Sequence, residues 1–396
     1  MAETTTDRDP RSVGTAGAED PGEWERPVVS TRDRDELRER LEAWMVARLG
    51  SSASPHVSPL DAPASNGMSS DTLLFEASWT EDGDERRESL VARLAPQDNA
   101  VPVFPTYDLA RQARVMQLVA EHTDVPVPHV HWVENDPEHL GAAFFVMGQV
   151  DGEVPPDVMP YTFGDSWVSE GTDADRLRLE RSTVSVLARL HTIPDTSERF
   201  AFLGGETDDG RGALRRHVDE QRAYFEWVME GRDGPLLERA FAWLEEHWPE
   251  EEGPAVLSWG DARIGNVMYR DFEPVAVLDW EMAALAPPEV DLGWMIFLHR
   301  FFQDIAAGMG LPGLPDFLVR DRVAGTYEDL SGYSPRDLDW YTTYAAVRHG
   351  IVMTRVGFRT AAFGQGEIPE DIDDLVMHRR ALEAMLGGTY WEAVGR

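Results

Sequence analysis

The sequence contains no cysteine and no lysine. The absence of cysteine excludes disulfide bridges, thiolate zinc sites and thiol nucleophiles. Long hydrophobic runs are also missing, because none approaches the ~18 residues that a membrane-spanning helix needs. The first ten residues lack the apolar core of a signal peptide. The sequence therefore predicts a cytoplasmic protein with no membrane partner.

Positive charge is scarce. The 36 basic residues, all of them arginine, face 72 acidic residues, which gives a net charge of −36. Such a surface repels nucleic acid and anionic membranes, so neither is expected as a partner. Carboxylates at this density are typical of halophilic proteins, which they keep soluble in salt. A GC-rich genome would also replace lysine with arginine, but we favour the halophilic interpretation.

The chain is long and apolar enough for a sizeable core. Its 396 residues are 42% hydrophobic and include 13 tryptophans, which predicts two domains or a two-lobed enzyme with extensions. Residues 1–29 are rich in polar, acidic, glycine and proline residues, and are predicted to form a disordered acidic tail. A helix is predicted to begin at Ser30 or Thr31, to end at Gly50 and to pack outside the first lobe.

Three oxygen-bearing side chains lie close together in residues 256–281. Asp261 and Asn266 share one loop, and Asp279 follows the next apolar run. The residues between them predict a hairpin: a strand over 266–269, a turn over 271–274 and a return strand over 275–278. Because a short hairpin brings its ends together, we expect Asp279 to lie near Asn266 and Asp261.

This arrangement fits phosphoryl transfer. Magnesium prefers oxygen ligands and usually binds one or two side chains plus substrate phosphates, so Asn266 and Asp279 are predicted to hold it. Asp261 is then available to accept a proton from an attacking hydroxyl, as in kinases. Arg263 is predicted to place a positive charge near the transferred phosphoryl group. The alternative is an ordinary loop of an acidic protein, which the combination of features disfavours.

The stretch resembles the aminoglycoside phosphotransferase family, which is related to choline kinase. The matching residues are Trp259-Gly260-Asp261, Asn266, Leu278-Asp279-Trp280-Glu281 and Asp291-Leu292. Trp259 replaces the usual histidine, which supports the loop rather than doing chemistry. The resemblance extends from about Ala64 to the C-terminus. It includes actinobacterial members of the family and the kinase-like domain fused to some acyl-CoA dehydrogenases.

The resemblance implies an α+β, two-lobed, protein-kinase-like fold. A small antiparallel sheet forms the nucleotide-binding lobe over residues 30–150, including the extra leading helix. A mainly helical lobe over residues 151–396 carries the catalytic and acceptor-binding residues. The helices expected in the second lobe cover residues 176–191, 214–230, 235–248, 338–355 and 372–386. The resemblance also implies structural roles for His191 and Asp291.

The resemblance further implies nucleotide-binding residues in the first lobe. Asn66, Gly67 and Ser69 belong to a small-residue loop that would approach phosphates, although a plain hairpin turn explains them equally well. Gln149 and Val150 are expected in the hinge between the lobes, where backbone groups would contact adenine.

Arg93 occupies the strand position at which kinases carry a phosphate-binding lysine. Arginine also binds phosphate well, and a surface arginine is the alternative. Gln112 replaces the glutamate that usually pairs with this cation. Gln112 can hydrogen-bond Arg93 but cannot neutralise its charge. Another acid, such as Asp108, could take the place of the usual glutamate.

The predicted reaction transfers the γ-phosphoryl group of ATP or GTP, with Mg²⁺, to a hydroxyl of a small-molecule acceptor. An aminoglycoside acceptor would require carboxylates around the pocket, whereas a hydroxyacyl-CoA or similar metabolite would require arginines. A non-catalytic, nucleotide-binding regulator is the third hypothesis, supported by Trp259 and Gln112.

Overall fold

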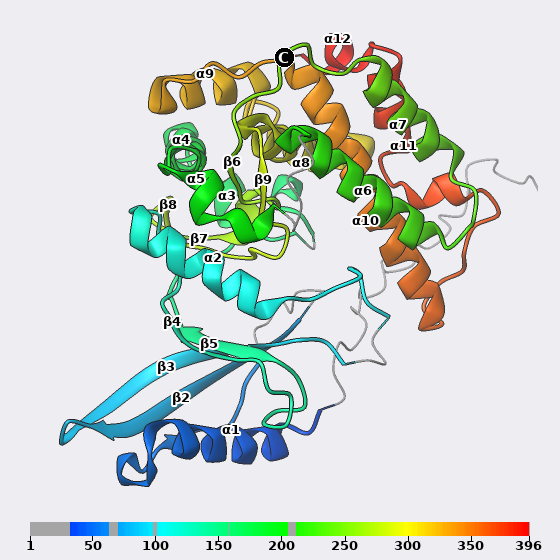
Figure 1. The fold of residues 1–396 in the computed structure, drawn as a ribbon. Coiled ribbons are helices and arrows are strands. Elements are labelled where there is room, and N and C mark those ends of the chain that lie inside the picture. Colours follow the sequence, from blue (N-terminus) through cyan, green and yellow to red (C-terminus); the bar gives the residue numbers. More distant parts are fainter. Residues whose placement is uncertain (1–31, 63–69, 98–100, 158, 205–210, 396) are drawn as a thin grey trace, which may run out of the picture.

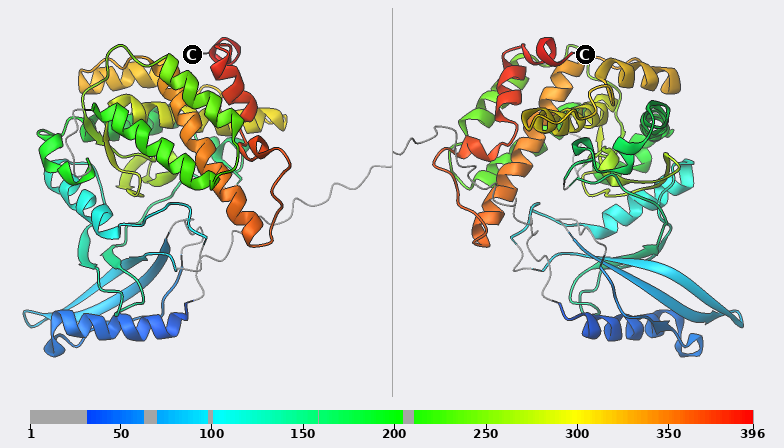
Figure 2. Two further views of the ribbon diagram at one scale, coloured as in Figure 1. Left: turned by 45° about the vertical axis from the view of Figure 1, so that its right-hand side comes forward. Right: turned by 180° about the vertical axis from the view of Figure 1, so that it is seen from behind.

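The chain folds into two lobes of unequal size (Figure 1). The computed structural model describes residues 32–62, 70–97, 101–157, 159–204 and 211–395. The smaller lobe holds a five-stranded sheet with a helix on its outer face, and the larger lobe is mainly helical (Figure 2). The predicted fold class, a two-lobed kinase-like α+β protein, is confirmed.

The sheet of the smaller lobe is antiparallel throughout. Its strand order is β1-β2-β3-β5-β4. The strands are β1 (His56–Val57), β2 (Asp71–Glu81), β3 (Asp84–Leu94), β4 (Val130–Glu134) and β5 (Phe144–Gly148). The β2–β3 turn is tight, because Glu81 at the end of β2 pairs with Asp84 at the start of β3.

The two faces of the sheet bury different side chains, since successive residues of a strand point to opposite faces. Leu90, Ala92 and Leu94 of β3 belong to the core shared with α1 (Arg34–Leu49). Val91 belongs to the core shared with α2 (Leu109–His122) and the larger lobe. The sheet is therefore held between α1 and the rest of the molecule.

Helix α1 covers the outer face of the sheet, as predicted (Figure 1). Trp44 packs edge-on against Phe144, with ring centroids 4.9 Å apart. The helix begins a few residues later than predicted, because Asp33 is its N-cap and accepts hydrogen bonds from two backbone amides of the first turn. Gly50 ends the helix, in a left-handed region at φ 88°.

The larger lobe contains the helices that surround the site. They are α3 (Trp167–Glu170), α4 (Asp173–His191), α5 (Thr196–Arg199), α6 (Ala213–Met229), α7 (Pro235–Glu246), α8 (Pro288–Gly308), α9 (Arg320–Ser331), α10 (Leu338–Ala362), α11 (Arg379–Leu386) and α12 (Tyr390–Val394). Helix α9 was not predicted. The helix predicted over 372–386 is divided into a 3₁₀ turn and α11, with Asp373 of the turn accepting a hydrogen bond from the Leu236 amide.

Two short strand pairs in the larger lobe flank the residues Asp261, Asn266 and Asp279. β6 (Val256–Ser258) pairs with β9 (Ala284–Ala286), and β7 (Val267–Arg270) pairs with β8 (Glu273–Val277). The predicted hairpin is thus confirmed. The Leu278 amide also donates to the Asn266 carbonyl at 2.8 Å, which brings the two ends of the hairpin together.

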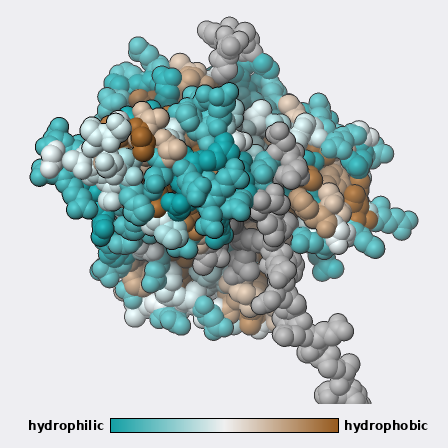
Figure 3. Space-filling view, turned by 90° about the horizontal axis from the view of Figure 1, so that it is seen from below, coloured by the Kyte–Doolittle hydropathy of each residue, from teal (hydrophilic) through white to brown (hydrophobic). Residues whose placement is uncertain are grey.

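The surface seen from the side of α1 is mostly hydrophilic, with apolar side chains in small scattered groups (Figure 3). None of the helices in the described part of the chain is both long and apolar enough to cross a bilayer.

Candidate active site

The loop of residues 259–266, called the Asp261 loop below, is held from beneath by Asp291 in the first turn of α8. One carboxylate oxygen of Asp291 accepts hydrogen bonds from the Ser258 hydroxyl at 2.7 Å and the Gly260 amide at 2.9 Å. The other accepts from the Trp259 amide at 2.7 Å and lies 3.0 Å from His191 Nε2. Asp291 therefore fixes the backbone of the loop.

The surroundings of Asp291 favour the charged form of its carboxylate. Burial alone would raise the pKa of Asp291, but the hydrogen bond and charge of His191 and the donors of the loop lower it below its usual range. His191 Nδ1 contacts the Tyr327 hydroxyl at 2.9 Å, so both ring nitrogens are engaged. These contacts agree with the structural roles expected for His191 and Asp291.

Trp259 and Gly260 join the loop to the segment around Asp279. The buried Trp259 indole donates to the carbonyls of Leu278, at 2.9 Å, and Asp279, at 3.2 Å. Gly260 has a φ of 92°, and a Cβ atom there would lie 2.0 Å from the Met282 carbonyl oxygen. Trp259, which departs from the family pattern, thus connects the Asp261 loop to the segment that contains Asp279.

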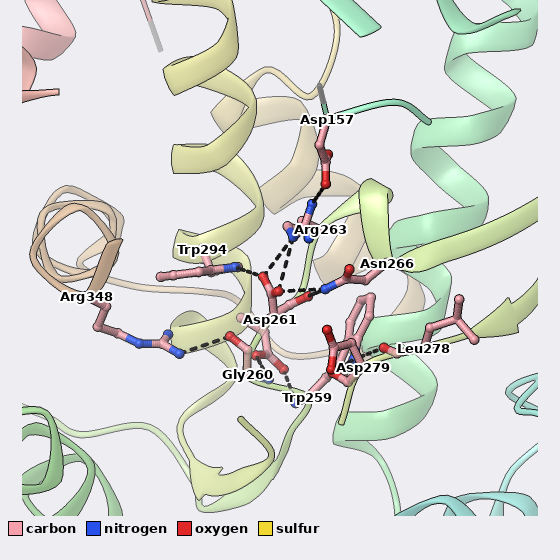
Figure 4. A network of polar contacts seen from close by, with 11 residues as sticks. Asp157, Trp259, Gly260, Asp261, Arg263, Asn266, Leu278, Asp279, Trp294 and Arg348 are labelled. Atoms are coloured by element: carbon pink, nitrogen blue, oxygen red, sulfur yellow. Dashed lines mark hydrogen bonds and ion pairs between the residues drawn. The ribbon is translucent and has the colours of Figure 1, made fainter. Parts of the chain in front are cut away.

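The Asp261 carboxylate accepts hydrogen bonds from three side chains (Figure 4). Trp294 Nε1 of α8 donates to one oxygen at 2.7 Å, and Asn266 Nδ2 donates to the other at 2.7 Å. Arg263 Nε lies 3.1 Å from both oxygens. This set of donors fixes the orientation of the carboxylate.

Arg263 lies between two carboxylates, those of Asp261 and Asp157. Burial lowers its pKa, but these two charges outweigh burial and raise it above the usual range. The arginine was predicted to neutralise the transferred phosphoryl group. Its guanidinium is instead already paired, so its contacts are those of a residue that orients Asp261.

Asp279 and Asn266 present oxygen atoms to the space beside Asp261 (Figure 4). Asp279 follows β8 in a left-handed conformation, with φ 59°. Its buried Oδ1 accepts no hydrogen bond from the described residues. Asn266 turns its amide nitrogen toward Asp261, which leaves its amide oxygen for another partner. A buried carboxylate oxygen beside an amide oxygen is a donor set that suits Mg²⁺.

Such an ion would need further ligands from outside the protein. In the part of the chain that the structure describes, no group of three or more His, Cys, Asp or Glu side chains could hold a metal. Magnesium commonly completes its coordination with waters and nucleotide phosphates. Asn266 and Asp279 therefore fit an ion that arrives with a nucleotide.

Arg93 of β3 points toward Asp279 across the boundary between the lobes. Its Nη2 lies 3.5 Å from Asp279 Oδ1, and its guanidinium donates to the Ser70 hydroxyl at 2.7 and 3.2 Å. The alternative of a surface arginine is excluded, because only 13% of the side chain is exposed.

The predicted partners of Arg93 were wrong. Among the described residues, Gln112 Oε1 has no hydrogen-bond partner, and Asp108 caps α2 by accepting from the Arg111 amide. Arg93 instead forms an ion pair with Asp279, which belongs to the larger lobe.

The other expected nucleotide residues are only partly visible. Asn66, Gly67 and Ser69 lie outside the described residues. Gln149 follows β5, and its amide donates to the Ser89 carbonyl at 2.9 Å, so it continues the sheet. Val150 lies in the connection that leads into the larger lobe, just after Gln149.

Sequence reasoning missed Arg348 in the middle of α10. Its Nη2 donates to the Gly260 carbonyl at 3.0 Å, and its guanidinium lies over the Trp294 ring, 4.4 Å from the centroid. The side chain is buried. The available signal was a single arginine within a long apolar run of a helix, which is unusual for a solvent-facing position.

Comparison with known proteins places this site in a family. The chain is 26% identical over 308 residues to a probable acyl-CoA dehydrogenase of Arabidopsis thaliana, IBR3. That match covers 74% of this chain but only 35% of the plant protein.

Two solved structures share the fold. A protein from Ralstonia eutropha, assigned by name to the aminoglycoside phosphotransferases, is 22% identical, has a TM-score of 0.61 and matches over 89% of this chain and 98% of its own. The complex of APH(2")-IIIa with GDP and kanamycin is 14% identical, with a TM-score of 0.54 over 86% of this chain and 98% of its own. At these identities the likeness establishes the fold alone.

A family model decides the assignment. The model described as "Phosphotransferase enzyme family" matches residues 63–319, more than half of the chain, and this range includes Arg93 and the whole Asp261 loop. The resemblance predicted from the motifs is confirmed: the chain belongs to the phosphotransferase enzyme family.

Proposed function

We propose that this protein is a small-molecule kinase in which Asp261 receives the proton of the acceptor hydroxyl. The observation that carries the proposal is the orientation of the Asp261 carboxylate by Trp294, Asn266 and Arg263. Three fixed donors hold the carboxylate in one position before the acceptor binds. Such a fixed position favours efficient proton transfer and correct placement of the acceptor hydroxyl.

The reaction balances as an in-line displacement. The acceptor oxygen forms a bond to the γ-phosphorus while the bond from that phosphorus to the β–γ bridging oxygen breaks. The proton of the hydroxyl passes to Asp261, and the nucleoside diphosphate leaves with the bridging oxygen. Because the transition state carries spread negative charge, fixed positive groups and donors supply most of the catalysis.

Asn266 and Asp279 would hold Mg²⁺, which supplies charge neutralisation for the phosphates when bound. Arg93 is the cation of the smaller lobe that faces the same space, through its contact with Asp279. Its hydrogen bonds to Ser70 also fix the end of the segment that contains the proposed phosphate-binding residues Asn66, Gly67 and Ser69.

The proposal assigns a different role to each lobe. Residues 30–150 would bind ATP or GTP, with the backbone of Gln149 and Val150 near the base. Residues 151–396 would supply the base, the metal ligands and the acceptor pocket. Arg263 serves as a positioning residue, because Asp157 and Asp261 already neutralise its charge.

The acceptor is a small molecule with a free hydroxyl, and two classes remain. An aminoglycoside is polycationic and is suggested by the fold neighbours. A hydroxylated metabolite, such as a hydroxyacyl-CoA, is suggested by the acyl-CoA dehydrogenase relative. A regulator that binds nucleotide without turnover is disfavoured by the intact set of Asp261, Asn266 and Asp279.

A screen for acceptor-dependent ADP or GDP release tests the proposal. The wild type and Asp261→Asn are compared with the same acceptors, nucleotide and Mg²⁺. Asp271→Asn is the matched control, because Asp271 is an exposed aspartate of the nearby hairpin turn. Release by the wild type and the control but not by Asp261→Asn supports the proposal. Equal release by all three proteins removes Asp261 from its role.

A further inference from the structure

A cavity of about 190 Å³ lies beside the Asp261 loop. It is bounded by the residues before and in the first turn of α2, by α6, by α10 and by residues 280–284. Arg348 of α10 forms the part of the wall next to the loop, since its Nη2 donates to the carbonyl of Gly260, the residue before Asp261 (Figure 4). A ligand in this cavity would therefore lie close to the proposed base.

Arg348 is not fully satisfied by the protein. The side chain is buried, at 1% exposed, yet its Nε and Nη1 atoms have no hydrogen-bond partner among the described residues. Arginine stays charged in proteins. A buried charge with unpaired donors is costly unless an anion or strong acceptor meets it.

The carboxylates that act on Arg348 are already occupied. Burial lowers the pKa of Arg348, and the charges of Asp291 and Asp261 partly oppose that effect. Asp291 accepts hydrogen bonds from the Asp261 loop and contacts His191. Asp261 accepts from Trp294 and two further side chains. No hydrogen bond joins either carboxylate to the guanidinium of Arg348 in the described structure.

The cavity wall carries further charges, which are the guanidinium of Arg111 and the carboxylates of Asp108, Glu220 and Glu281. Arg111 Nη2 donates to the Ala283 carbonyl at 2.9 Å, and Asp108 accepts from the Arg111 amide. Burial raises the pKa of Glu220, and Arg111 is the first cation that opposes this shift. Glu281 also lines the cavity and has a partner of its own. Arg348 is thus the cation of this wall whose donors lack partners in the described structure.

A second unpartnered atom lines the same cavity. Gln112 is buried, and its Oε1 accepts no hydrogen bond from the described residues. Arg348 thus leaves two donors unused and Gln112 leaves one acceptor unused, at atoms that are themselves enclosed, and both residues line the cavity. A ligand with an anionic group and a nearby hydroxyl or N–H would complement both.

From these groups we infer that the acceptor carries an anionic group, a carboxylate or a phosphate, which Arg348 binds beside the Asp261 loop. This inference rests on the proposed kinase function and narrows its substrate class. It narrows the acceptor to molecules with an anionic group, because an acceptor without one would leave the donors of Arg348 unpaired. The carboxylates of Asp108, Glu220 and Glu281 allow the same molecule to carry a positive charge as well. Arg348 is then a specificity residue for the acceptor.

A set of probes of equal chain length tests the inference. 4-Hydroxybutanoate, 4-hydroxybutanamide, 4-aminobutan-1-ol and 4-hydroxybutyl phosphate differ mainly in charge, and kanamycin provides a polycation. Binding is measured by calorimetry with a non-hydrolysable ATP analogue and Mg²⁺, and turnover by ADP release. The wild type should bind one of the two anions at least ~10-fold more tightly than the amide and the amine, as one charge-assisted hydrogen bond implies.

Arg348→Met should lose this preference, by about 10- to 100-fold for the anion, while binding of the amide changes little. Arg348→Lys, which keeps the charge and is less disruptive, should retain part of it. Arg355→Met is the matched control. Arg355 is also a buried arginine of α10 stacked on a tryptophan, but it donates to the Pro102 carbonyl and does not line the cavity.

The outcomes separate the inference from the function it rests on. Nucleotide binding with no transfer to any acceptor argues against the proposed function, whereas probe binding by calorimetry does not require transfer. The inference is overturned if the wild type binds neither anion, if it prefers the amine or kanamycin, or if Arg348→Met keeps the preference for the anion. The two anionic probes distinguish a carboxylate from a phosphate.

Discussion

Asp291 and Asp279 lie on two sides of the Asp261 loop and differ in how their oxygens are used. Asp291 accepts hydrogen bonds from the Ser258 hydroxyl and from two amides of the loop and contacts His191, so both of its oxygens are occupied. Asp279 Oδ1 is buried, accepts no hydrogen bond from the described residues and lies 3.5 Å from Arg93 Nη2, and the backbone of Asp279 is left-handed. A carboxylate whose oxygens all accept hydrogen bonds stabilises the local fold, whereas one with an oxygen that accepts none is suited to bind a ligand.

The same contrast separates two arginines. Arg263 is paired with Asp261 and Asp157, while Arg348 makes one hydrogen bond to the loop and leaves two nitrogen atoms without partners among the described residues. On this comparison, the saturated residues should affect mainly stability and orientation. The unsaturated ones should affect ligand binding.

Asp291→Ala should have the largest effect, and it should act on stability. It removes the acceptor of the Ser258 hydroxyl and of two loop amides, and it leaves the buried His191 without its contact to a carboxylate. Breaking a buried charged network of this kind typically costs about 3–5 kcal/mol. Urea unfolding at neutral pH measures the loss. Asp329→Ala, in an exposed position of α9, is the control, and an equal loss in both variants would contradict the role of Asp291.

Asp261→Asn should leave the fold intact and reduce turnover by roughly 100-fold or more, since general-base catalysis usually contributes that much. The amide keeps most of the shape but cannot accept the hydroxyl proton. Nucleotide affinity should change little, because Asp261 is not a proposed ligand of the metal. Steady-state rates and nucleotide titrations on one preparation separate the two quantities, and an unchanged kcat would remove the base from the mechanism.

Acid should destabilise the protein well before its carboxylates are protonated. Burial lowers the pKa of His217 and His299 to about 3 and of His378 to about 4. In the unfolded chain the same side chains titrate near ~6.5. Between these values only the unfolded state binds the protons, so the free energy of unfolding falls as the pH drops from ~6.5 toward ~3.

Urea midpoints at pH 7.5, 6 and 5 and constant salt check this dependence. His299→Gln should flatten the slope, since glutamine keeps a side-chain donor for the Leu314 carbonyl but does not titrate. A midpoint independent of pH over this range would show that these rings are charged in the folded state.

Trp294→Phe should have the smallest effect. It removes the indole donor of Asp261 and keeps an aromatic ring beneath Arg348. A hydrogen bond to a charged acceptor contributes about 1.5–3 kcal/mol, which corresponds to a fall in kcat of about tenfold or more if it acts only on orientation. A rise in KM alone, with kcat unchanged, would place Trp294 in acceptor binding instead.

Much of this site could be predicted from the sequence because its parts are local. The hairpin between Asn266 and Asp279 follows from strand and turn chemistry, and it brings the two residues together whatever surrounds it. The resemblance to kinases predicted a phosphate-binding cation at Arg93, and the structure brings this side chain to Asp279, whereas Arg86 and Arg87 of the same strand are exposed. The resemblance to the family also predicted structural roles for His191 and Asp291, which stabilise the Asp261 loop.

The contacts that span the lobes could not be predicted. The partner of Arg93 proved to be Asp279 rather than Gln112 or Asp108, because the pairing depends on how β3 meets the larger lobe. The double pairing of Arg263 depends on Asp157, more than a hundred residues earlier. Arg348 reaches the loop only because α10 packs against α8, and no local pattern encodes that packing.

The central claim is that Asp279 is left unsaturated for an ion that arrives with the nucleotide. Calorimetric titration of ATP, with and without Mg²⁺, into the wild type and Asp279→Ala tests it most directly. The account predicts Mg²⁺-dependent binding in the wild type that is lost in Asp279→Ala, with thermal unfolding of both proteins nearly the same. Mg²⁺-dependent binding that survives in Asp279→Ala, or its absence from the wild type, would contradict the account.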